Sequence, residues 1–141
     1  APCIEACPSK VTVPRYIEIA RRTGRSAYVG EGSNRWPAVH NVDAARVFRL
    51  ALERGMPGVR YHAVAEEGVP FKQVAEVIGR WLGVPAISLS PLAARRHFGL
   101  FAGYAREDGP ASSTLTCEWL GWRPEGPSLL ADIDRPEYYE P

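Results

Sequence analysis

The segment from Tyr28 to Ala45, with the sequence YVGEGSNRWPAVHNVDAA, most restricts the structures open to this chain. The glycines of Gly30-Glu31-Gly32 are typical of a tight turn, and the apolar run Ala38–Val42 is typical of a short strand. Asp43 is predicted to be the N-cap of a helix over Ala44–Arg54, because an aspartate accepts a hydrogen bond from the free N–H groups at a helix start. The segment therefore predicts a turn, a buried strand and a helix in close succession.

Elsewhere, amphipathic stretches of helical period alternate with short apolar runs bounded by glycine or proline. The predicted helices are Val13 to Gly24 with Pro14 in its first turn, Pro70–Leu82, Ser90–His97, and a short one that begins within Ser112–Thr116. The other predicted strands are Ala27–Val29, Val59–Val64 and Ala86–Leu89. Gly99–Pro110 is expected to be a loop, and the chain from Pro127 a frayed tail. This alternation favours an α/β fold with few short strands and flanking helices.

Strands so few and brief would leave open sheet edges and exposed apolar helix faces if the chain stood alone. The 141 residues suit one domain, or about half of a two-lobed enzyme of roughly 300 residues. We therefore expect a further lobe, outside this sequence, to cover those surfaces. Within the chain we expect an irregular segment over residues 1–12, the main folded portion over 13–130, and a tail over 131–141.

Composition argues against several classes of partner. Seventeen basic residues against sixteen acidic ones leave a formal charge of +1, with no basic stripe, so nucleic acid is not expected. No apolar run approaches the ~20 residues that cross a membrane, and no signal-peptide pattern is present. Three cysteines without a framework indicate reduced thiols and a cytoplasmic setting. Cys3 and Cys7 share the spacing of part of an iron–sulfur motif, but the remaining cysteines of such a motif are missing.

Three residues are candidates for binding a small-molecule substrate: Arg35, Trp36 and His40. Arginine offers a planar fork of donors that fits phosphate or carboxylate, and a neighbouring Trp can stack on a ring. The alternative is that Arg35 pairs with Glu31 while Trp36 fills the core. His40 is either a hydrogen-bonded core residue or a general base whose tautomer is fixed by Asp43, three positions further on.

Motifs for catalysis are absent from the sequence. No glycine set matches a dinucleotide or P-loop fingerprint, and no serine lies in a G-x-S-x-G turn. Neither lysine, Lys10 or Lys72, follows a tyrosine by four positions. We assign no catalytic, cofactor-binding or metal-binding residue, and no chemistry to His62 or His97. Asp132 and Asp134, which have metal-like spacing, are expected to be solvated.

The order of these motifs resembles the C-terminal portion of the extended or atypical short-chain dehydrogenase/reductase family, the NAD-dependent epimerase/dehydratase-like group. Asn34-Arg35-Trp36 followed by Val39-His40 and Asp43, then the helix AARVFRLALE, match its pattern. The segments YHAVAEEGVPFKQVAEVIGRWLG and SSTLTCEWLGWRP resemble its next strand and helix and its closing signature. Residues 1–12 do not look like the strand and loop that the family places before the first helix.

The resemblance implies the C-terminal part of a Rossmann-like short-chain dehydrogenase fold, whose parent transfers hydride using NAD or NADP bound by an N-terminal Rossmann lobe. It implies that Arg35 reaches a substrate phosphate, that the parent forms a homodimer, and that this chain alone binds no cofactor and turns over no substrate. The alternative is a non-catalytic ligand-binding or regulatory domain on the same scaffold.

Overall fold

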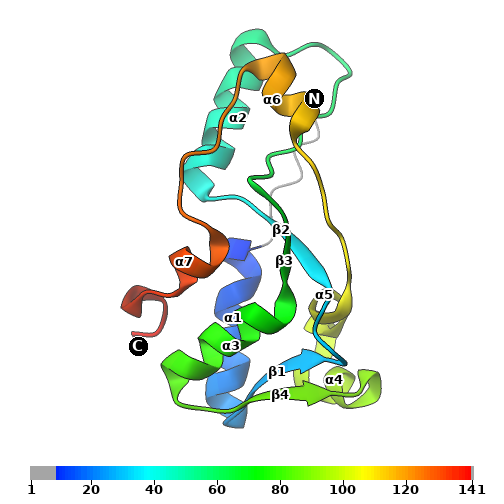
Figure 1. Ribbon diagram of the computed structural model, residues 1–141, viewed down its shortest axis with the longest axis vertical. Coiled ribbons are helices and arrows are strands. Elements are labelled where there is room, and N and C mark those ends of the chain that lie inside the picture. The colour runs from blue at the N-terminus through cyan, green and yellow to red at the C-terminus, as the bar shows by residue number, and fades with distance from the viewer. Residues whose placement is uncertain (1–8, 141) are drawn as a thin grey trace.

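The computed structural model of the chain describes residues 9–140, with side chains described from residue 13 onward. Figure 1 shows an elongated molecule in which two short sheets are surrounded by helices. The main helices are α1 (Ser9–Thr23), α2 (Asn41–Arg54), α3 (Phe71–Leu82), α4 (Pro91–Phe98), α5 (Ala102–Arg106), α6 (Thr114–Leu120) and α7 (Leu129–Ile133). The strands are β1 (Ser26–Val29), β2 (Arg35–Ala38), β3 (Glu66–Pro70) and β4 (Ala86–Leu89), and two 3₁₀ turns cover Gly99–Phe101 (η1) and Pro136–Tyr138 (η2).

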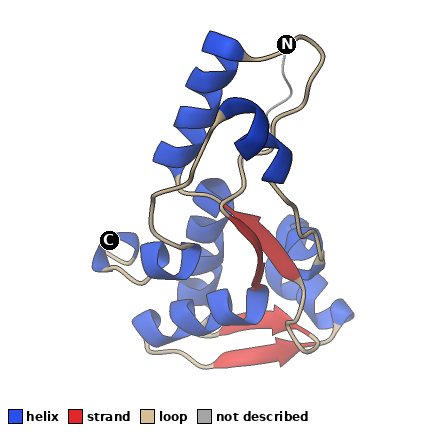
Figure 2. Cartoon of the chain, turned by 45° about the horizontal axis from the view of Figure 1, so that its top comes forward, coloured by secondary structure: helices blue, strands red, loops and turns tan. Residues whose placement is uncertain are grey.

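The four strands form two separate pairs (Figure 2). β1 and β4 are parallel, with Ser26 opposite Ala86 and Val29 opposite Leu89. β2 and β3 are antiparallel, with Arg35 opposite Pro70 and a register shift between Trp36 and Ala38. The predicted α/β class with few short strands and flanking helices is confirmed, as are the helix over 71–82 and the strand over 86–89.

Two hydrophobic clusters hold the described residues together. The larger joins α1, α3, α4, α5 and α7 around the sheets, with Tyr16, Trp36 and Phe71 among its buried aromatic residues. The smaller lies under α2, where Val47 and Leu50 pack with Tyr61, Ala63, Leu120 and Trp122. In Figure 1 the helices of the smaller cluster, α2 and α6, lie at the end of the molecule away from β1 and β4.

The segment Val59–Val64 is not a strand, so that prediction was wrong. Its side chains are buried as expected, since Tyr61 and Ala63 are each 1% exposed. A strand also needs a neighbour for its backbone, and no strand of the described part of the chain pairs with this segment. Side chains of α6 and the residue before it supply bonds instead: Thr116 Oγ1 accepts from the His62 N–H at 2.8 Å, and Ser113 Oγ donates to the Val64 carbonyl.

Several predicted boundaries also require correction. The strand predicted over Ala38–Val42 lies over Arg35–Ala38, because the chain turns at His40 into α2. Residues 9–12, expected to be irregular, belong to α1, which places Pro14 inside the helix and not in its first turn. Part of the predicted loop Gly99–Pro110 forms η1 and α5, and the predicted frayed tail contains α7 and η2.

Candidate functional site

Arg35 is the one sequence-predicted site residue whose charged group reaches the surface. It is the first residue of β2, and its partner is Asp108, 73 residues away in the loop after α5. Nε and Nη2 of Arg35 each donate to the carboxylate at 2.9 Å, and the Arg35 backbone N–H donates to the same group at 2.8 Å. The expected alternative partner, Glu31, is not the residue that Arg35 contacts.

The backbone around this ion pair fixes its position. Asn34 Nδ2 donates to the carbonyls of Ala105 and Glu107, and the Gly109 N–H donates to the Arg35 carbonyl at 3.0 Å. On the facing strand, any side chain at Gly68 would crowd the arginine stem, because a Cβ there would lie 2.9 Å from Arg35 Cβ. The local structure therefore holds the guanidinium group against the loop that carries Asp108.

Electrostatics reinforce the pair while leaving it accessible. Hydrogen bonds from the Arg35 side chain and backbone lower the pKa of Asp108 to about 2, and Asp108 raises the pKa of Arg35. The two side chains remain 48% and 47% exposed. Because a guanidinium has five N–H donors and Asp108 takes two of them, Arg35 keeps donors for a second anion on its open edge.

Trp36 lies in the core, as the alternative interpretation of the sequence had it. The residue is 6% exposed, and its ring packs against Phe71 at 4.6 Å and Tyr16 at 5.6 Å between centroids. Its indole N–H donates to the Tyr104 carbonyl at 2.9 Å, which ties β2 to α5. The structure therefore gives Trp36 a part in positioning the strand that carries Arg35.

The turn before β2 requires its second glycine. Gly32 has a φ of +66°, a backbone conformation that L side chains rarely adopt, and a Cβ there would lie 2.6 Å from Lys72 Cβ. Its carbonyl accepts the Lys72 N–H at 3.1 Å, which joins the turn to the start of α3. The Gly-x-Gly signal in the sequence thus marks a close backbone approach.

His40 is the N-cap residue of α2, the position that the sequence had assigned to Asp43. Its Nδ1 accepts a 3.4 Å hydrogen bond from the Val42 N–H, which leaves the proton of a neutral ring on Nε2. Nε2 lies 3.8 Å from Asp132 and does not meet Asp43 as expected. The cavity beside His40 has a volume of about 20 Å³, space for roughly one water molecule, so it is too small for a substrate.

Asp43 has a different role from the predicted cap. It lies in the first turn of α2, is 2% exposed, and its carboxylate accepts hydrogen bonds from the N–H groups of Glu125 and Gly126. Its own carbonyl accepts the indole N–H of the fully buried Trp122 at 3.0 Å. A Cβ on Gly126 would lie 2.6 Å from His40 Cβ, so glycine is needed there. Asp43 therefore fastens the segment after α6 to the start of α2.

The two aspartates near the C-terminus both accept hydrogen bonds. Asp134 is exposed, as expected, whereas the burial of Asp132 corrects the expectation that it is solvated. Asp132, 8% exposed, accepts from Arg135 and from the Tyr138 hydroxyl at 2.6 Å. Asp134 accepts from Arg80 Nη2 at 2.7 Å and from Trp81 Nε1 at 2.6 Å, and these bonds lower its pKa. Their partners come from the C-terminal segment and from α3, a pairing that spacing along the chain does not reveal.

The remaining histidines and cysteines lie apart from Arg35. His62 lines an open pocket of about 520 Å³ beside α6, and its Nδ1 lies 3.1 Å from the Ser112 carbonyl. His97 lines another open pocket, of about 330 Å³, at the end of α4. Cys117 is a free, half-buried thiol, while Cys3 and Cys7 lie outside the described residues. Over residues 9–140, no three His, Cys, Asp or Glu side chains gather as a metal site would require.

From the sequence, no segment was expected to cross a membrane. Across the part of the chain that the structure describes, no helix combines the length and the apolar character that crossing a bilayer demands.

Comparisons by sequence identify two fungal relatives. The chain is 44% identical over 138 residues to Uncharacterized protein C2A9.02 of Schizosaccharomyces pombe, with 98% of the chain and 47% of that protein covered. It is 48% identical over 124 residues to Uncharacterized protein YLL056C of Saccharomyces cerevisiae, with 88% of the chain and 42% of that protein covered. No protein-family model matches the sequence. The chain thus spans about half the length of the curated relatives it matches.

Comparisons by structure identify solved dehydratases. The chain superposes on DesIV, a dTDP-glucose 4,6-dehydratase from Streptomyces venezuelae with NAD and TYD bound, with a TM-score of 0.64 at 19% identity over 94% of this chain and 39% of that one. The NAD complex of a dTDP-glucose 4,6-dehydratase from Bacillus anthracis gives a TM-score of 0.62 at 16% identity, covering 97% and 42% of the two chains. The chain therefore has the fold of part of a Rossmann-like dehydratase.

Proposed function

We propose that this chain is the substrate-binding portion of an NAD(P)-dependent epimerase/dehydratase-like oxidoreductase, and that it requires a further lobe for turnover. The observation that carries the proposal is the superposition on two NAD-bound dehydratases over nearly the whole chain but less than half of theirs. In this proposal NAD or NADP is held by the other lobe, and Arg35 lines the substrate site. We further propose that the protein is cytoplasmic and that its full-length parent is a homodimer.

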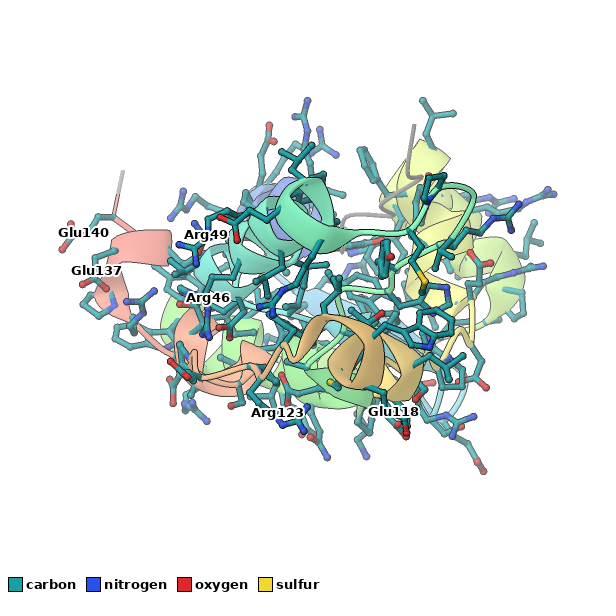
Figure 3. The ribbon with its side chains drawn as sticks, turned by 90° about the horizontal axis from the view of Figure 1, so that it is seen from above. Arg46, Arg49, Glu118, Arg123, Glu137 and Glu140 are labelled. Atoms are coloured by element: carbon teal, nitrogen blue, oxygen red, sulfur yellow. The ribbon has the colours of Figure 1, made fainter. Side chains whose placement is uncertain are left out.

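An uncovered apolar surface supports the need for a second lobe. Six of the ten large apolar side chains that remain exposed among the described residues belong to α2, the loop after it, and α6: Val42, Phe48, Leu52, Met56, Leu115 and Trp119. Phe48 is 42% exposed and Leu52 is 83% exposed, one turn apart on the same helix. Seen from above, Arg46 and Arg49 lie on the flank of α2 nearer the C-terminal segment that bears Glu137 and Glu140 (Figure 3). Phe48 and Leu52 belong to a different face of the helix.

The unpaired segment Val59–Val64 supports the same conclusion. It lies next to this apolar surface in the chain, its odd-numbered side chains Tyr61 and Ala63 are buried, and no described strand pairs with it. A segment with buried side chains and no strand partner offers an edge at which a sheet of another lobe would continue. In the proposal, the sheet of the cofactor-binding lobe pairs here and α2 packs on that lobe.

Arg35 is the residue through which we propose substrate contact. Its free donors suit an oxyanion of a small-molecule substrate, and Asp108 holds the guanidinium in place without neutralising its open edge. Trp36 and His40 then act by holding β2 and the start of α2, which fixes where Arg35 lies.

A chimera tests the two-lobed proposal. The half of the S. pombe relative that this chain does not cover is fused to it, and NAD(P)H binding is followed by the change in cofactor fluorescence. We expect cofactor binding by the chimera and none by the 141-residue chain. Binding of equal strength by the isolated chain, or none by a chimera that circular dichroism shows to be folded, contradicts the proposal.

Arg35 is tested in the same chimera. Once a substrate has been found by screening sugar nucleotides and related phosphorylated compounds, Arg35→Ala is expected to raise KM by about tenfold or more, the loss of one charge-assisted interaction. Arg49→Ala is the matched control, because Arg49 is an exposed arginine whose partner is Glu53, a neighbour on its own helix. Unchanged KM and kcat in Arg35→Ala would remove Arg35 from the substrate site.

A further inference from the structure

A second basic site lies at the far end of the molecule from α2. The open pocket of about 330 Å³ is lined by Arg22, Arg25, Arg96 and His97, with Leu89 and Ala93 as its apolar part. No aspartate or glutamate lines it. The pocket is distinct from the Arg35–Asp108 pair, whose residues do not contribute to it.

Four elements bring these side chains together. Arg22 is in the last turn of α1, and Gly24, with a φ of +70°, reverses the chain so that Arg25 follows just before β1. Arg96 and His97 are in the last turn of α4, which follows β4, the parallel partner of β1. The two helix ends lie close together because α1 and α4 contact each other and both contact β1.

The charges in this pocket are not compensated by any acidic side chain that the structure describes. None of Arg22, Arg25 and Arg96 forms an ion pair with any residue that the structure describes. The preceding residue of α1, Arg21, is by contrast bound to the Tyr139 carbonyl at 2.7 Å. Three guanidinium groups around one pocket repel each other unless an anion joins them, because no carboxylate separates them.

His97 provides a second, independent observation. Its Nε2 is buried and has no hydrogen-bond partner among the described residues. Burial lowers the pKa of His97, and the charges of Arg25 and Arg22 lower it further. A buried polar nitrogen without a partner is costly. His97 lines the pocket, so a turn of its ring would bring this nitrogen to a ligand atom there.

Stabilisation of the helix dipoles by arginine does not by itself explain why these basic side chains meet at one pocket. Cations in the last turn of a helix are stabilising, which accounts for Arg22 and Arg96 separately. It does not account for Arg25, which lies outside both helices, for the meeting of two helix ends at one pocket, or for the unpartnered nitrogen of His97.

We propose that this pocket binds a phosphate-type oxyanion, with the three guanidinium groups around the anion and His97 at its edge. Planar guanidinium groups match the geometry of phosphate oxygens, and Leu89 and Ala93 would contact a small apolar body attached to the phosphate. The proposal does not depend on the proposed oxidoreductase function, since it concerns residues of this chain remote from Arg35.

The test uses inorganic pyrophosphate with the ¹⁵N-labelled 141-residue chain, observed by NMR at constant ionic strength set with chloride. We expect saturable shifts of the amides of Arg25, Ala93 and His97, and a rise in the pKa of His97 on binding, since a nearby anion favours the imidazolium form. Arg25→Gln and Arg96→Gln should each weaken binding about tenfold. Arg95→Gln, on the same helix but outside the pocket, should change it less than about twofold.

Each other outcome overturns the proposal. Absence of saturable shifts shows that the pocket holds no such anion. Equal losses in Arg95→Gln and Arg96→Gln show a diffuse charge effect only. Tighter binding of a single-stranded oligonucleotide than of pyrophosphate, lost in Arg25→Gln, assigns the surface to nucleic acid. Circular dichroism of every variant, read before titration, confirms that a loss of binding is not a loss of folding.

Discussion

Arg35 and Asp108 make the most accessible ion pair of the candidate site, and their geometry is that of a bidentate fork. Sequence reasoning selected Arg35 as a candidate because its planar fork of donors suits phosphate or carboxylate and because it stands beside Trp36. It could not identify Asp108, since nothing along the chain links positions 73 residues apart. The arginine donor can therefore be selected from the sequence, but only the fold shows that its partner is Asp108.

The depressed pKa of Asp108 predicts an acid-dependent stability. Because the folded pKa is about 2 and the unfolded value is near 4, the pair stabilises the fold fully above about pH 4. That contribution is lost as the pH falls through about 2. We expect the free energy of unfolding, from urea titrations at pH 5 to 2, to decline less steeply in Asp108→Asn than in the unmodified chain.

The control for this prediction is the adjacent Glu107→Gln, because the Glu107 side chain is exposed and only its backbone carbonyl takes part in the hydrogen bonds around the Arg35 pair. NMR titration of the carboxyl carbons reports Asp108 directly. An Asp108 carboxyl that titrates near 4, or parallel pH profiles in the two chains, would contradict the structure.

At the scale of elements, the predictions succeeded where a helix or strand carries its own signal. α3 has a continuous apolar face ended by Gly83, whose φ of +65° closes the helix, and periodicity alone located it. The prediction failed for Val59–Val64, whose apolar pattern is that of a strand but with which no described strand pairs. Strand formation depends on a neighbour, and no local pattern can supply one.

The C-terminal segment is the element for which local signals were most misleading. Proline and acidic residues suggested a frayed tail, yet Tyr139 stacks on Trp81 of α3 with centroids 5.2 Å apart and planes 6° from parallel. Arg21 of α1 also donates to the Tyr139 carbonyl at 2.7 Å. The tail is therefore fastened to two helices by contacts that span most of the chain.

Replacing the stacked ring should loosen this segment. Tyr139→Ala removes the stacking on Trp81 and the burial of the ring, and we expect a loss of about 1–2 kcal/mol in the free energy of unfolding and faster amide exchange over residues 134–140. Tyr139→Phe is the matched control. It keeps the ring and deletes a buried hydroxyl that has no described partner, so it should be neutral or stabilising. Equal losses in both variants would show that the stacking is not what holds the tail.

At the scale of the whole molecule, the described residues form two unequal cores, and α2, which packs on the smaller one, also carries exposed apolar side chains. Val47 is fully buried while Phe48, the next residue of α2, is 42% exposed. Sequence reasoning anticipated uncovered apolar faces from the small number of strands, although it did not locate them. Their location on α2, α6 and the loop between α2 and β3 follows from the fold alone.

This asymmetry gives a prediction that separates an uncovered interface from ordinary surface. The double substitution Phe48→Lys and Leu52→Lys should leave the stability of the isolated chain nearly unchanged, because both side chains are exposed, and should reduce its self-association. In the two-lobed chimera the same pair should weaken lobe packing and NAD(P)H binding, since two charges would then be buried.

The control pair is Leu92→Lys in α4 and Leu100→Lys in η1, at positions 63% and 95% exposed. Figure 1 shows α4 at the opposite end of the molecule from α2. We expect this control pair to change neither the self-association of the isolated chain nor NAD(P)H binding by the chimera, because these exposed apolar residues lie outside the proposed lobe contact. Light scattering after size-exclusion chromatography measures association, and cofactor fluorescence measures binding. If both pairs act alike in the chimera, α2 does not face the second lobe, and the exposed apolar residues around it are only surface.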